Sequence, residues 1–364
     1  MLPPRFRRAM KAARAAPGVF WMASRASGYR VPSVARRFAL AMKHRYEPGE
    51  AFETGVLDPD RPLDVFSKYA SRSEMARLQK ALNPDEWEWL LADKGIFYRY
   101  CLLHKLPMPG LLGLWFKEQA GWSPEGLPID TQERWEDRFL RRFPTEFVVK
   151  PARSVYGDGI RIMTRDGSDL VDHEGNRQSV HEFLVSLESH PSYSSFVLQE
   201  RLANHPGLAM MSGGCGVLSV RVITQLDRTG VPRVLTSNLK VIVGDNIVSN
   251  NRHGALGNLV AEIDIERGVI EFCSGGDAAH GGHVKIERHP DTGAVFTGTP
   301  IPHWTAVLDL AMRAAGVFAP VRTVGWDVAV TPLGVRLLEG NIWYDPPTHA
   351  GRTGALLSRM EQLR

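Results

Sequence analysis

The chain has 364 residues, of which 43% are hydrophobic and 23% are charged, and its formal net charge is +4 at pH 7. This composition is ordinary for a soluble globular protein, and the length suffices for one large domain or for two or three modest ones. No apolar run approaches the roughly 18 residues of a membrane-spanning helix. The three cysteines are isolated in the sequence, so they indicate neither a disulfide framework nor a metal-ligand cluster, and they fit a reducing compartment such as the cytoplasm.

The positive charge is concentrated at the N-terminus. Residues 1–50 contain eleven of the 44 Lys and Arg residues and only two of the 40 acidic residues. The first basic residues recur at helix-like intervals, so this arm could lie peripherally on the anionic inner face of a membrane or contact an acidic partner. A solvated helical arm and an Arg-rich transit peptide are the alternatives. Nucleic-acid binding is disfavoured, because the arm lacks interleaved stacking aromatics and no known reader motif follows it.

Residues 1–85 are predicted to form a helical, basic N-terminal region. Amphipathic patterns indicate helices near 34–44 and 71–82. The tetrapeptide at 83–86 (Asn-Pro-Asp-Glu) is typical of a helix start, with Asn83 as the N-cap, a proline at the first helical position and acids in the first turn.

From residue 146 onward the pattern changes to short apolar strands separated by turns. Helices interrupt these strands near 180–188 and 304–315, and another helix precedes them at 95–104. Strands of this kind, covered by a few helices, predict an α+β fold built from antiparallel hairpins.

Residues 147–164 carry the first sign of a nucleotide site. An apolar strand ends at Lys150, and a loop that contains Ser154, Gly157 and Gly159 leads into the next strand. Such a loop lets backbone N–H groups approach phosphate oxygens, and the Lys150 ammonium could reach the same phosphates. An ordinary hairpin turn is the alternative. The sequence contains neither a P-loop nor a Rossmann motif.

A second strand, Ser195–Leu202, runs from apolar into polar residues. A strand that ends in this way can form a hinge whose backbone reads an adenine edge, while Gln199 and Glu200 contact the base or the ribose. A plain strand terminus is the alternative.

Residues 325–341 read as two short strands joined by the loop 332–334 (Pro-Leu-Gly), a three-residue hairpin turn. This turn pairs Thr331 with Val335. Counting outward from that pair places two acidic side chains directly opposite each other, and the alternation of side chains puts an amide on the same face.

The two facing carboxylates belong to Asp327 and Glu339, and the amide belongs to Asn341. Like charges opposite each other destabilise a sheet. A divalent cation would remove the repulsion, and a set of oxygen ligands favours Mg²⁺ or Mn²⁺. On this reasoning, replacing either acid by its amide stabilises the metal-free protein. A solvated polar face without an ion is the alternative.

These motifs occur in the order of the ATP-grasp superfamily, with Lys94 ahead of them in the segment 91–109. Further segments are most similar to the sugar-transfer-associated branch, which is related to glutamate-ligase-like proteins; they are 218–224, 289–293, 300–304 and 325–327. The resemblance covers roughly residues 90–345 and leaves residues 1–80 without a counterpart.

The resemblance implies two α+β lobes, residues 86–200 and 201–364, that grip ATP between antiparallel sheets. It assigns Lys94, Lys150, Ser154, Gly157 and Gly159 to the phosphates, Gln199, Glu200 and Leu202 to the adenine pocket, and Asp327, Glu339 and Asn341 to one or two Mg²⁺ ions. Two departures stand out. Asp158 separates the two glycines of the loop, and Ser219 stands where many ligases have an acid.

The implied activity is that of a ligase acting in the synthesis of cell-surface polysaccharides or secondary metabolites. Such enzymes transfer the γ-phosphate of ATP to a carboxylate, and an amine or similar nucleophile then attacks the acyl phosphate. Arg221, Arg252 and Lys240 are the candidates to clamp the anionic intermediate, because guanidinium and ammonium groups bind carboxylate and phosphate. A surface salt bridge is the alternative for each of them.

Other functions compete with the ligase. The same grip could phosphorylate a hydroxyl group and stop there, as a small-molecule or sugar kinase. A nucleotide-binding scaffold is disfavoured, because a pure binder needs no metal clamp. Zinc binding by His280, His283 and His289 lacks a paired cysteine, and a serine hydrolase lacks the Gly-x-Ser-x-Gly elbow.

Overall fold

The computed structural model describes residues 17–19, 23, 31–250, 256–277, 280–347 and 350–363. Most of residues 1–30, the first part of the predicted basic arm (residues 1–50), lie outside these ranges. The following part of the chain is helical, as predicted. Its elements are α2 (Val31–Lys43), α3 (Pro48–Glu53), α4 (Val65–Lys68), α5 (Arg72–Leu82), the 3-10 turn η1 (Asp85–Trp87), α6 (Trp89–Ala92) and α7 (Lys94–Leu103).

The middle of the chain forms one sheet with two covering helices. Its elements are β1 (Leu111–Phe116), β2 (Gly121–Trp122), β3 (Pro128–Ile129), α8 (Gln132–Arg141), β4 (Glu146–Pro151), β5 (Arg161–Asp166), β6 (Asp169–Asp172), β7 (Arg177–Ser179), α9 (Val180–Glu188) and β8 (Ser195–Glu200). The strand order is β3-β2-β1-β8-β4-β5-β6-β7, and the neighbouring strands are antiparallel.

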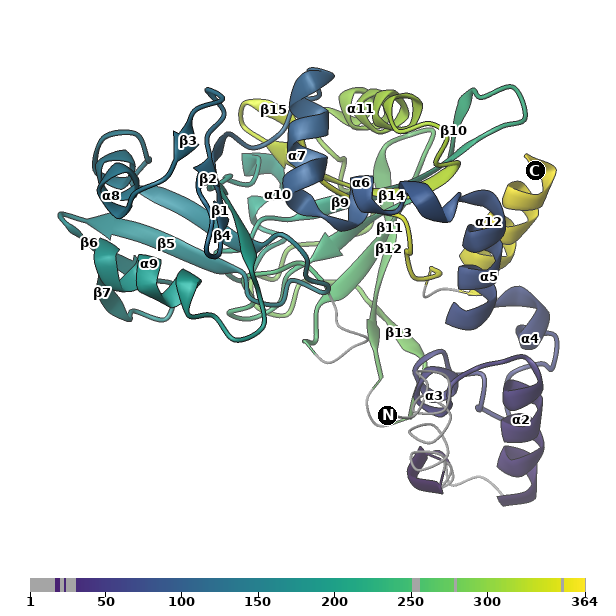
Figure 1. Cartoon of the computed structure of the whole chain (residues 1–364). Helices are drawn as coiled ribbons and strands as arrows, with labels where there is room; N and C mark the ends of the chain where they lie inside the picture. The colour runs from purple at the N-terminus through teal and green to yellow at the C-terminus, as the bar shows by residue number, and fades with distance from the viewer. Residues whose placement is uncertain are drawn as a thin grey trace.

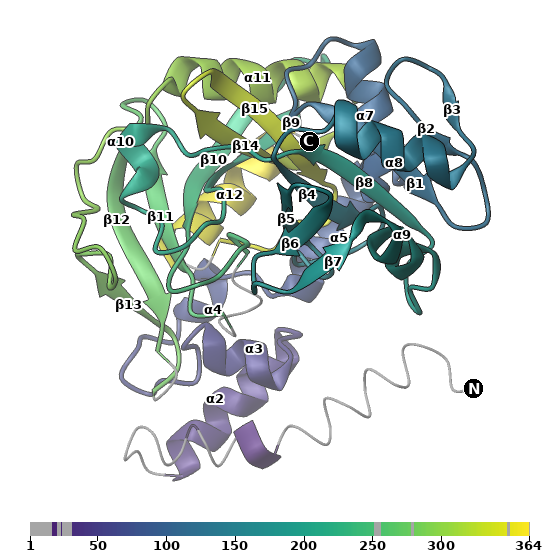
Figure 2. The same ribbon diagram turned by 90° about the vertical axis from the view of Figure 1, so that its left-hand side faces the viewer.

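The C-terminal part of the chain forms a second sheet. Its elements are α10 (Pro206–Ala209), β9 (Ser219–Leu226), β10 (Pro232–Val241), β11 (Leu259–Asp264), β12 (Val269–Gly276), β13 (His283–Ile286), α11 (Trp304–Val317), β14 (Thr323–Thr331), β15 (Gly334–Asn341) and α12 (Ala350–Gln362). The order β13-β12-β11-β10-β9-β14-β15 is again antiparallel between neighbours. The predicted α+β class is therefore confirmed, and Figures 1 and 2 show the two sheets side by side.

Side chains alternate along β8, so its residues are divided between the two faces of the first sheet. Phe196 and Leu198 pack with α8 and α9, while Val197 belongs to a second cluster that continues into the other sheet. Gln199 shares the face of Val197, because side chains two positions apart lie on one side of a strand. The hydrophobic residues of β8 thus direct Gln199 away from the covering helices.

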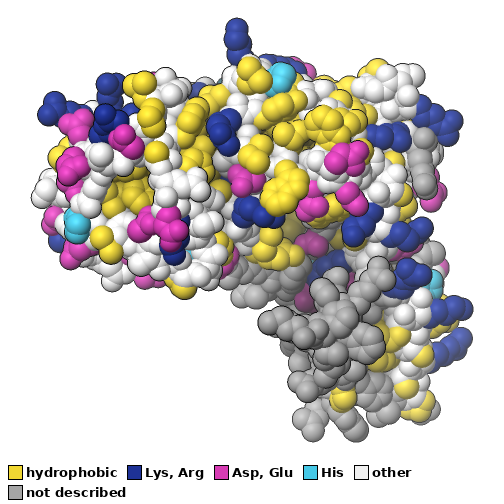
Figure 3. All heavy atoms as spheres, viewed as in Figure 1, with side chains coloured by type: hydrophobic (Ala, Val, Ile, Leu, Met, Phe, Trp, Pro, Cys, Tyr) yellow, Lys and Arg dark blue, Asp and Glu magenta, His cyan; other side chains and the backbone are white. Residues whose placement is uncertain are grey.

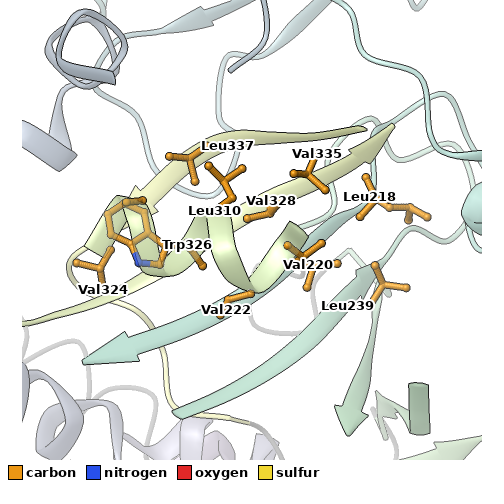
Figure 4. Packing of buried hydrophobic residues seen from close by; sticks show 14 of the residues in the cluster. Leu218, Val220, Val222, Leu239, Leu310, Val324, Trp326, Val328, Val335 and Leu337 are labelled. Atoms are coloured by element: carbon orange, nitrogen blue, oxygen red, sulfur yellow. The ribbon is translucent and has the colours of Figure 1, made fainter. Parts of the chain in front are cut away.

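In the second sheet, too, apolar side chains lie on one face and polar side chains on the other. Trp326 and Val328 on β14 are fully buried against α11, together with Val220 and Val222 on β9 (Figure 4). The Trp326 indole donates a hydrogen bond to the hydroxyl of Thr224 at 2.8 Å. Residues between these apolar positions point to the opposite face, which is how the polar side chains of β9 and β14 come to lie together.

A helical turn, η1, does begin close to the predicted start, at Asp85, but the predicted N-cap role of Asn83 is wrong. Asn83 ends α5, and its buried amide pairs with the backbone of Thr323, donating to the carbonyl at 2.9 Å and accepting from the N–H at 2.9 Å. The amide thereby extends the hydrogen bonding of β14. The helix that carries Lys94 is capped instead by Asp93, which accepts a hydrogen bond from the N–H of Ile96 at 3.0 Å.

The surface of the protein is mixed in character. On the face shown in Figure 3, hydrophobic side chains lie among acidic and basic ones over the described part of the molecule. None of the helices in the described ranges is both long and apolar enough to cross a membrane.

Candidate functional site

A cavity of about 1150 Å³ is lined by residues from both sheets and by residues of the N-terminal helical region. It collects most of the predicted site residues. Those that line it are Lys94, Lys150, Ser154, Gly157, Gln199, Leu202, Arg221, Lys240, Asp327, Glu339 and Asn341. The residues predicted for phosphate, adenine, metal and catalysis therefore share one cavity, which is the usual setting for a ligand site.

Two predicted residues are placed differently, and the structure does not describe a third. Glu200 points to the other face of β8, and its carboxylate packs against Gly110 rather than lining the cavity. Gly159 packs against Pro151 at the base of the loop and does not line the cavity. Arg252 lies outside the described residues.

Two buried lysines form the basic side of the cavity. Lys94 Nζ donates to the carbonyl of Ser154 at 2.9 Å, and Lys150 Nζ lies 5.0 Å from the centre of the Tyr98 ring. Burial and the nearby charge of Lys94 lower the pKa of Lys150 to about 7, although Glu339 opposes the shift. Neither lysine has a carboxylate within ion-pair distance in the described part of the chain. Such a pair of cations favours the binding of an anion.

Tyr98, which the sequence analysis missed, does not line the cavity itself but contacts two residues that do. Its hydroxyl bonds to the side-chain oxygen of Gln199 and accepts a hydrogen bond from Lys150 Nζ at 3.4 Å. It therefore joins α7, β4 and β8 at the cavity. A signal was present in the sequence, because Tyr98 lies one helical turn after Lys94 and hence on the same helix face.

The glycine loop lies against the second lobe. Gly157 has a φ of +73°, and a Cβ placed on it would come within 2.7 Å of Val248 Cγ1. Only glycine combines this backbone conformation with so close an approach. Asp158, which separates Gly157 from Gly159, accepts a hydrogen bond from the hydroxyl of Tyr193. The loop is thus held on both sides.

Asp327 lies opposite Glu339, as predicted, but for a different reason. The turn has two residues rather than three, because Thr331 pairs with Gly334. A β-bulge between Asp327 and Val328 then shifts the register by one residue. The shorter turn and the bulge cancel, so the two acids still face each other.

The charge of Asp327 is balanced by two cations. Arg221 Nε and Nη2 donate to its carboxylate oxygens at 2.6 and 2.9 Å, and Lys240 Nζ donates at 2.8 Å. Burial raises the pKa of Asp327, but Arg221 and Lys240 outweigh burial and hold that pKa well below its usual range. The repulsion between the two acids is therefore offset without a metal ion. These ion pairs argue against the expectation that an amide at position 327 stabilises the protein, because the amide would leave two buried cations without their counterion.

The sequence model of the family described as sugar-transfer associated ATP-grasp matches residues 73–348. The chain belongs to this family. The resemblance drawn from the motifs is thereby confirmed. No curated protein sequence matches the chain.

Among solved structures, this ATP-grasp chain is similar to a RimK domain protein ATP-grasp from Sphaerobacter thermophilus. The two share 11% sequence identity, and the match covers 76% of this chain and 69% of that chain with a TM-score of 0.40. It is also similar to D-alanine–D-alanine ligases. The one from Bacillus anthracis has 10% identity, 80% and 74% coverage and a TM-score of 0.40. The one from Coxiella burnetii has 12% identity, 79% and 63% coverage and a TM-score of 0.40.

The oxygen groups of the ATP-grasp hairpin fit a divalent cation by their chemistry. Asn341 Nδ2 lies 3.3 Å from Glu339 Oε1 and 3.4 Å from Asp327 Oδ2, so the three side chains meet in the cavity. A half-turn of the Asn341 amide would present its oxygen instead of its nitrogen. Within the described residues no group of three or more His, Cys, Asp and Glu side chains could hold a metal ion, so a site here needs the amide as its third ligand.

The rim of the cavity carries further residues that the sequence analysis did not single out. Arg153 lines the cavity, and its guanidinium lies 4.2 Å from the centre of the Trp89 ring, which is 54% exposed. Residues that precede the family match also line the cavity.

Proposed function

We propose that this ATP-grasp protein is an ATP- and Mg²⁺-dependent ligase that joins a carboxylate to an amine through an acyl phosphate. The observation that carries the proposal is the meeting, in one cavity, of the Lys94–Lys150 pair with the Arg221–Asp327–Lys240 cluster. Membership of the ATP-grasp family supports it.

The lysines and the glycine loop are assigned to the nucleotide. Buried Lys94 and Lys150 provide two positive charges for the phosphates, and Gly157 lets the loop backbone come close to them. Gln199 and Leu202 would hold the adenine, because they line the cavity where β8 ends. The proposed phosphate site thus lies near the end of β4, which carries Lys150, and the proposed adenine site near the end of β8.

Glu339, Asn341 and Asp327 would hold Mg²⁺. When bound, the ion offsets negative charge on the phosphoryl group in transfer. Glu339 is the acid best placed for this role, because within the described residues it has no ion-pair partner. The carboxylate of Asp327 already pairs with Arg221 and Lys240, so it would bind the ion while it keeps these two partners.

Arg221 and Lys240 are assigned to the carboxylate substrate and its acyl phosphate. Together with Asp327 they carry one surplus positive charge, and all three are almost fully buried. A buried cluster with surplus positive charge stabilises an anion held against it. Their hydrogen bonds to Asp327 fix both side chains in place before a substrate arrives, so little reorganisation is needed.

The experiment has two stages. Thermal unfolding is followed with ATP, GTP and a non-hydrolysable ATP analogue, each with and without Mg²⁺, since a ligand that binds the folded state raises its midpoint. Carboxylates are then incubated with ATP, Mg²⁺ and hydroxylamine, which converts an acyl phosphate into a hydroxamate. Hydroxamate from one carboxylate supports the ligase, whereas phosphorylation of a hydroxyl group without hydroxamate would make the protein a kinase.

A further inference from the structure

Part of the cavity wall is formed by chain that precedes the family match. The match begins at residue 73, yet Glu53, Thr54, Tyr69 and Arg72 line the cavity. These residues belong to the segment 46–72, called here the N-terminal wall. In Figures 1 and 2 its helix α3 lies next to the end of β13.

The N-terminal wall is a packed element. Phe52, Val56 and Tyr69 are buried in one hydrophobic cluster with residues of α2. Arg37 on α2 is 4% exposed, and its guanidinium donates to the carbonyls of Val56, at 3.0 Å, and of Arg61. These contacts fix the shape of the wall, so its side chains face the cavity in a defined arrangement.

Glycines let the wall dock directly on the second lobe. The N–H of Gly282 donates to the carbonyl of Phe52 at 2.9 Å. Gly281 has a φ of +78°, and a Cβ on it would lie 2.6 Å from the same carbonyl oxygen. The hairpin held in this way connects β12 and β13, and its residues Asp277 and His283 line the cavity as well.

Ion pairs join the wall to the segment that follows the metal-site hairpin. Arg72 Nη2 lies 2.6 Å from Glu53 Oε2, and Arg72 Nε lies 3.6 Å from Asp345 Oδ1. Asp345 comes four residues after Asn341, and it also lines the cavity. All three charged side chains keep between 28% and 48% of their surface exposed, so a molecule in the cavity can reach them.

From this geometry we infer that the N-terminal wall forms the acceptor side of the cavity and selects a hydrophilic amine, one with further polar groups beside its amino group. Glu53 and Arg72 are the specificity-determining residues. The inference rests on the proposed ligase function and adds to it the contacts of the second substrate. It concerns residues outside the part of the chain that the family model covers.

The charges of the wall set the preference. Glu53 and Arg72 are partly hydrated, and an apolar amine would displace their water without replacing its hydrogen bonds. An amino acid or an amino sugar restores those bonds with its own polar groups. The wall therefore discriminates by the desolvation cost that it imposes on the wrong acceptor.

The test uses the full chain, ATP, Mg²⁺ and the carboxylate that yields the most hydroxamate. Amine-dependent ADP release is measured with alanine, lysine and glucosamine as hydrophilic acceptors and with butylamine and benzylamine as apolar ones. We expect at least a tenfold preference in kcat/KM for a hydrophilic amine. Glu53→Gln and Arg72→Gln should each raise the KM for that amine at least tenfold, and much more than the KM for ATP.

A matched pair of glycine variants distinguishes the effect of disturbing the docked wall from the effect of backbone strain at a positive φ. Gly281→Ala places a methyl group against Phe52, whereas Gly230→Ala has a similar φ of +84° and open space around it. Gly281→Ala should raise the KM for the amine as Arg72→Gln does, and Gly230→Ala should behave like the parent protein. Equal KM values in all these proteins, or a preference for apolar amines, would overturn the inference.

Failure of the proposed function would look different. If no carboxylate gives hydroxamate, the ligase proposal fails. The role of the N-terminal wall is then tested by binding of the same amines to the protein in the presence of a non-hydrolysable ATP analogue. Slower amide hydrogen exchange within residues 46–72 on addition of a hydrophilic amine would support the acceptor side. Unchanged exchange there with every amine would overturn it.

Discussion

Arg221 on β9 and Asp327 on β14 are direct neighbours in the strand register, and two hydrogen bonds between their side chains tie the strands together above the backbone ladder. The next strand on one side supplies Lys240, and the next strand on the other side supplies Glu339. The charged centre of the cavity thus spans four adjacent strands of one sheet. A site built on strands holds its side chains more firmly than one built on loops.

This arrangement predicts opposite outcomes for the two acids. Asp327→Asn should lower the free energy of unfolding by about 3–5 kcal/mol, because it leaves Arg221 and Lys240 buried without their counterion. Glu339→Gln should change it by only about 0.5 kcal/mol, since that acid has no ion-pair partner within the described residues. Urea denaturation of both variants measures the difference. Equal stability of the two variants would show that the ion pairs do not hold Asp327.

The Glu339→Gln variant should lose activity without losing stability. Glu339→Gln is expected to remain folded and to lose Mg²⁺-dependent turnover, because it removes the acid best placed to bind the ion. Turnover and far-UV circular dichroism of the same sample give both readouts. Full Mg²⁺-dependent turnover in Glu339→Gln would refute the assignment of the metal site to this hairpin.

The depressed pKa of Lys150 predicts a pH dependence of nucleotide binding. In the free protein this pKa is about 7, so Lys150 loses its proton as the pH rises above neutrality. Bound phosphate favours the charged form and raises the pKa, so binding takes up protons. Affinity for a non-hydrolysable ATP analogue should therefore fall with rising pH, by up to about tenfold per pH unit above pH 7.

Isothermal titration calorimetry in buffers of different ionisation enthalpy measures the proton uptake directly. Lys150→Met removes the titrating group, so its weaker binding should vary less with pH than that of the parent protein. A parent protein that binds the nucleotide without taking up protons at pH 8 would contradict the phosphate role of Lys150.

Gly157 and Gly167 offer a matched pair in the first lobe. Both have a positive φ, +73° and +65°, but a Cβ on Gly157 would meet Val248 while Gly167 has open space around it. Gly157→Ala should displace the loop and weaken nucleotide binding at least about tenfold, whereas Gly167→Ala carries a similar backbone strain without that effect. Nucleotide titrations of the two variants make the comparison. Equal affinities would mean that the loop does not approach the phosphates.

Cys215 is a natural reporter for the proposed adenine side of the cavity, because Arg201, next to Leu202, donates a hydrogen bond to its carbonyl at 3.1 Å. It is exposed and lines the cavity, whereas Cys101 and Cys273 are buried, and burial raises the pKa of Cys273 to about 12. One thiol should therefore react quickly with a thiol reagent in the native protein. A saturating ATP analogue should slow that reaction at least about tenfold. Cys215→Ser removes the fast phase and identifies it, and an unchanged rate with nucleotide bound would exclude adenine from this side.

Sequence patterns predicted the strand faces of the site well, because local chemistry fixes them. Alternation along β14 requires Asp327 to point away from buried Trp326, whatever the rest of the chain does. The facing of Asp327 and Glu339 was also correct, but only because the bulge compensated for a turn of the wrong length. A bulge leaves little trace in a sequence, since either strand can absorb the extra residue.

Long-range partners could not be predicted. Asn83 has the neighbours of a helix cap, yet its amide pairs with Thr323, which is 240 residues away in the chain. The role of Arg72 likewise depends on Asp345. Helix propensity and capping patterns describe neighbours in the chain, so they carry no information on such contacts.

The docking of the N-terminal region has a consequence for the newly made protein. Gln79 on α5 donates a hydrogen bond to the carbonyl of Tyr344 at 2.8 Å, across a separation of 265 residues. At a synthesis rate of about 5–20 residues per second, the partner of Gln79 leaves the ribosome roughly 13 to 53 s later. Helix α5 is thus made well before the segment with which it pairs. The cavity is lined by residues from Glu50 to Pro347, so it is complete only after both of these parts of the chain have been made.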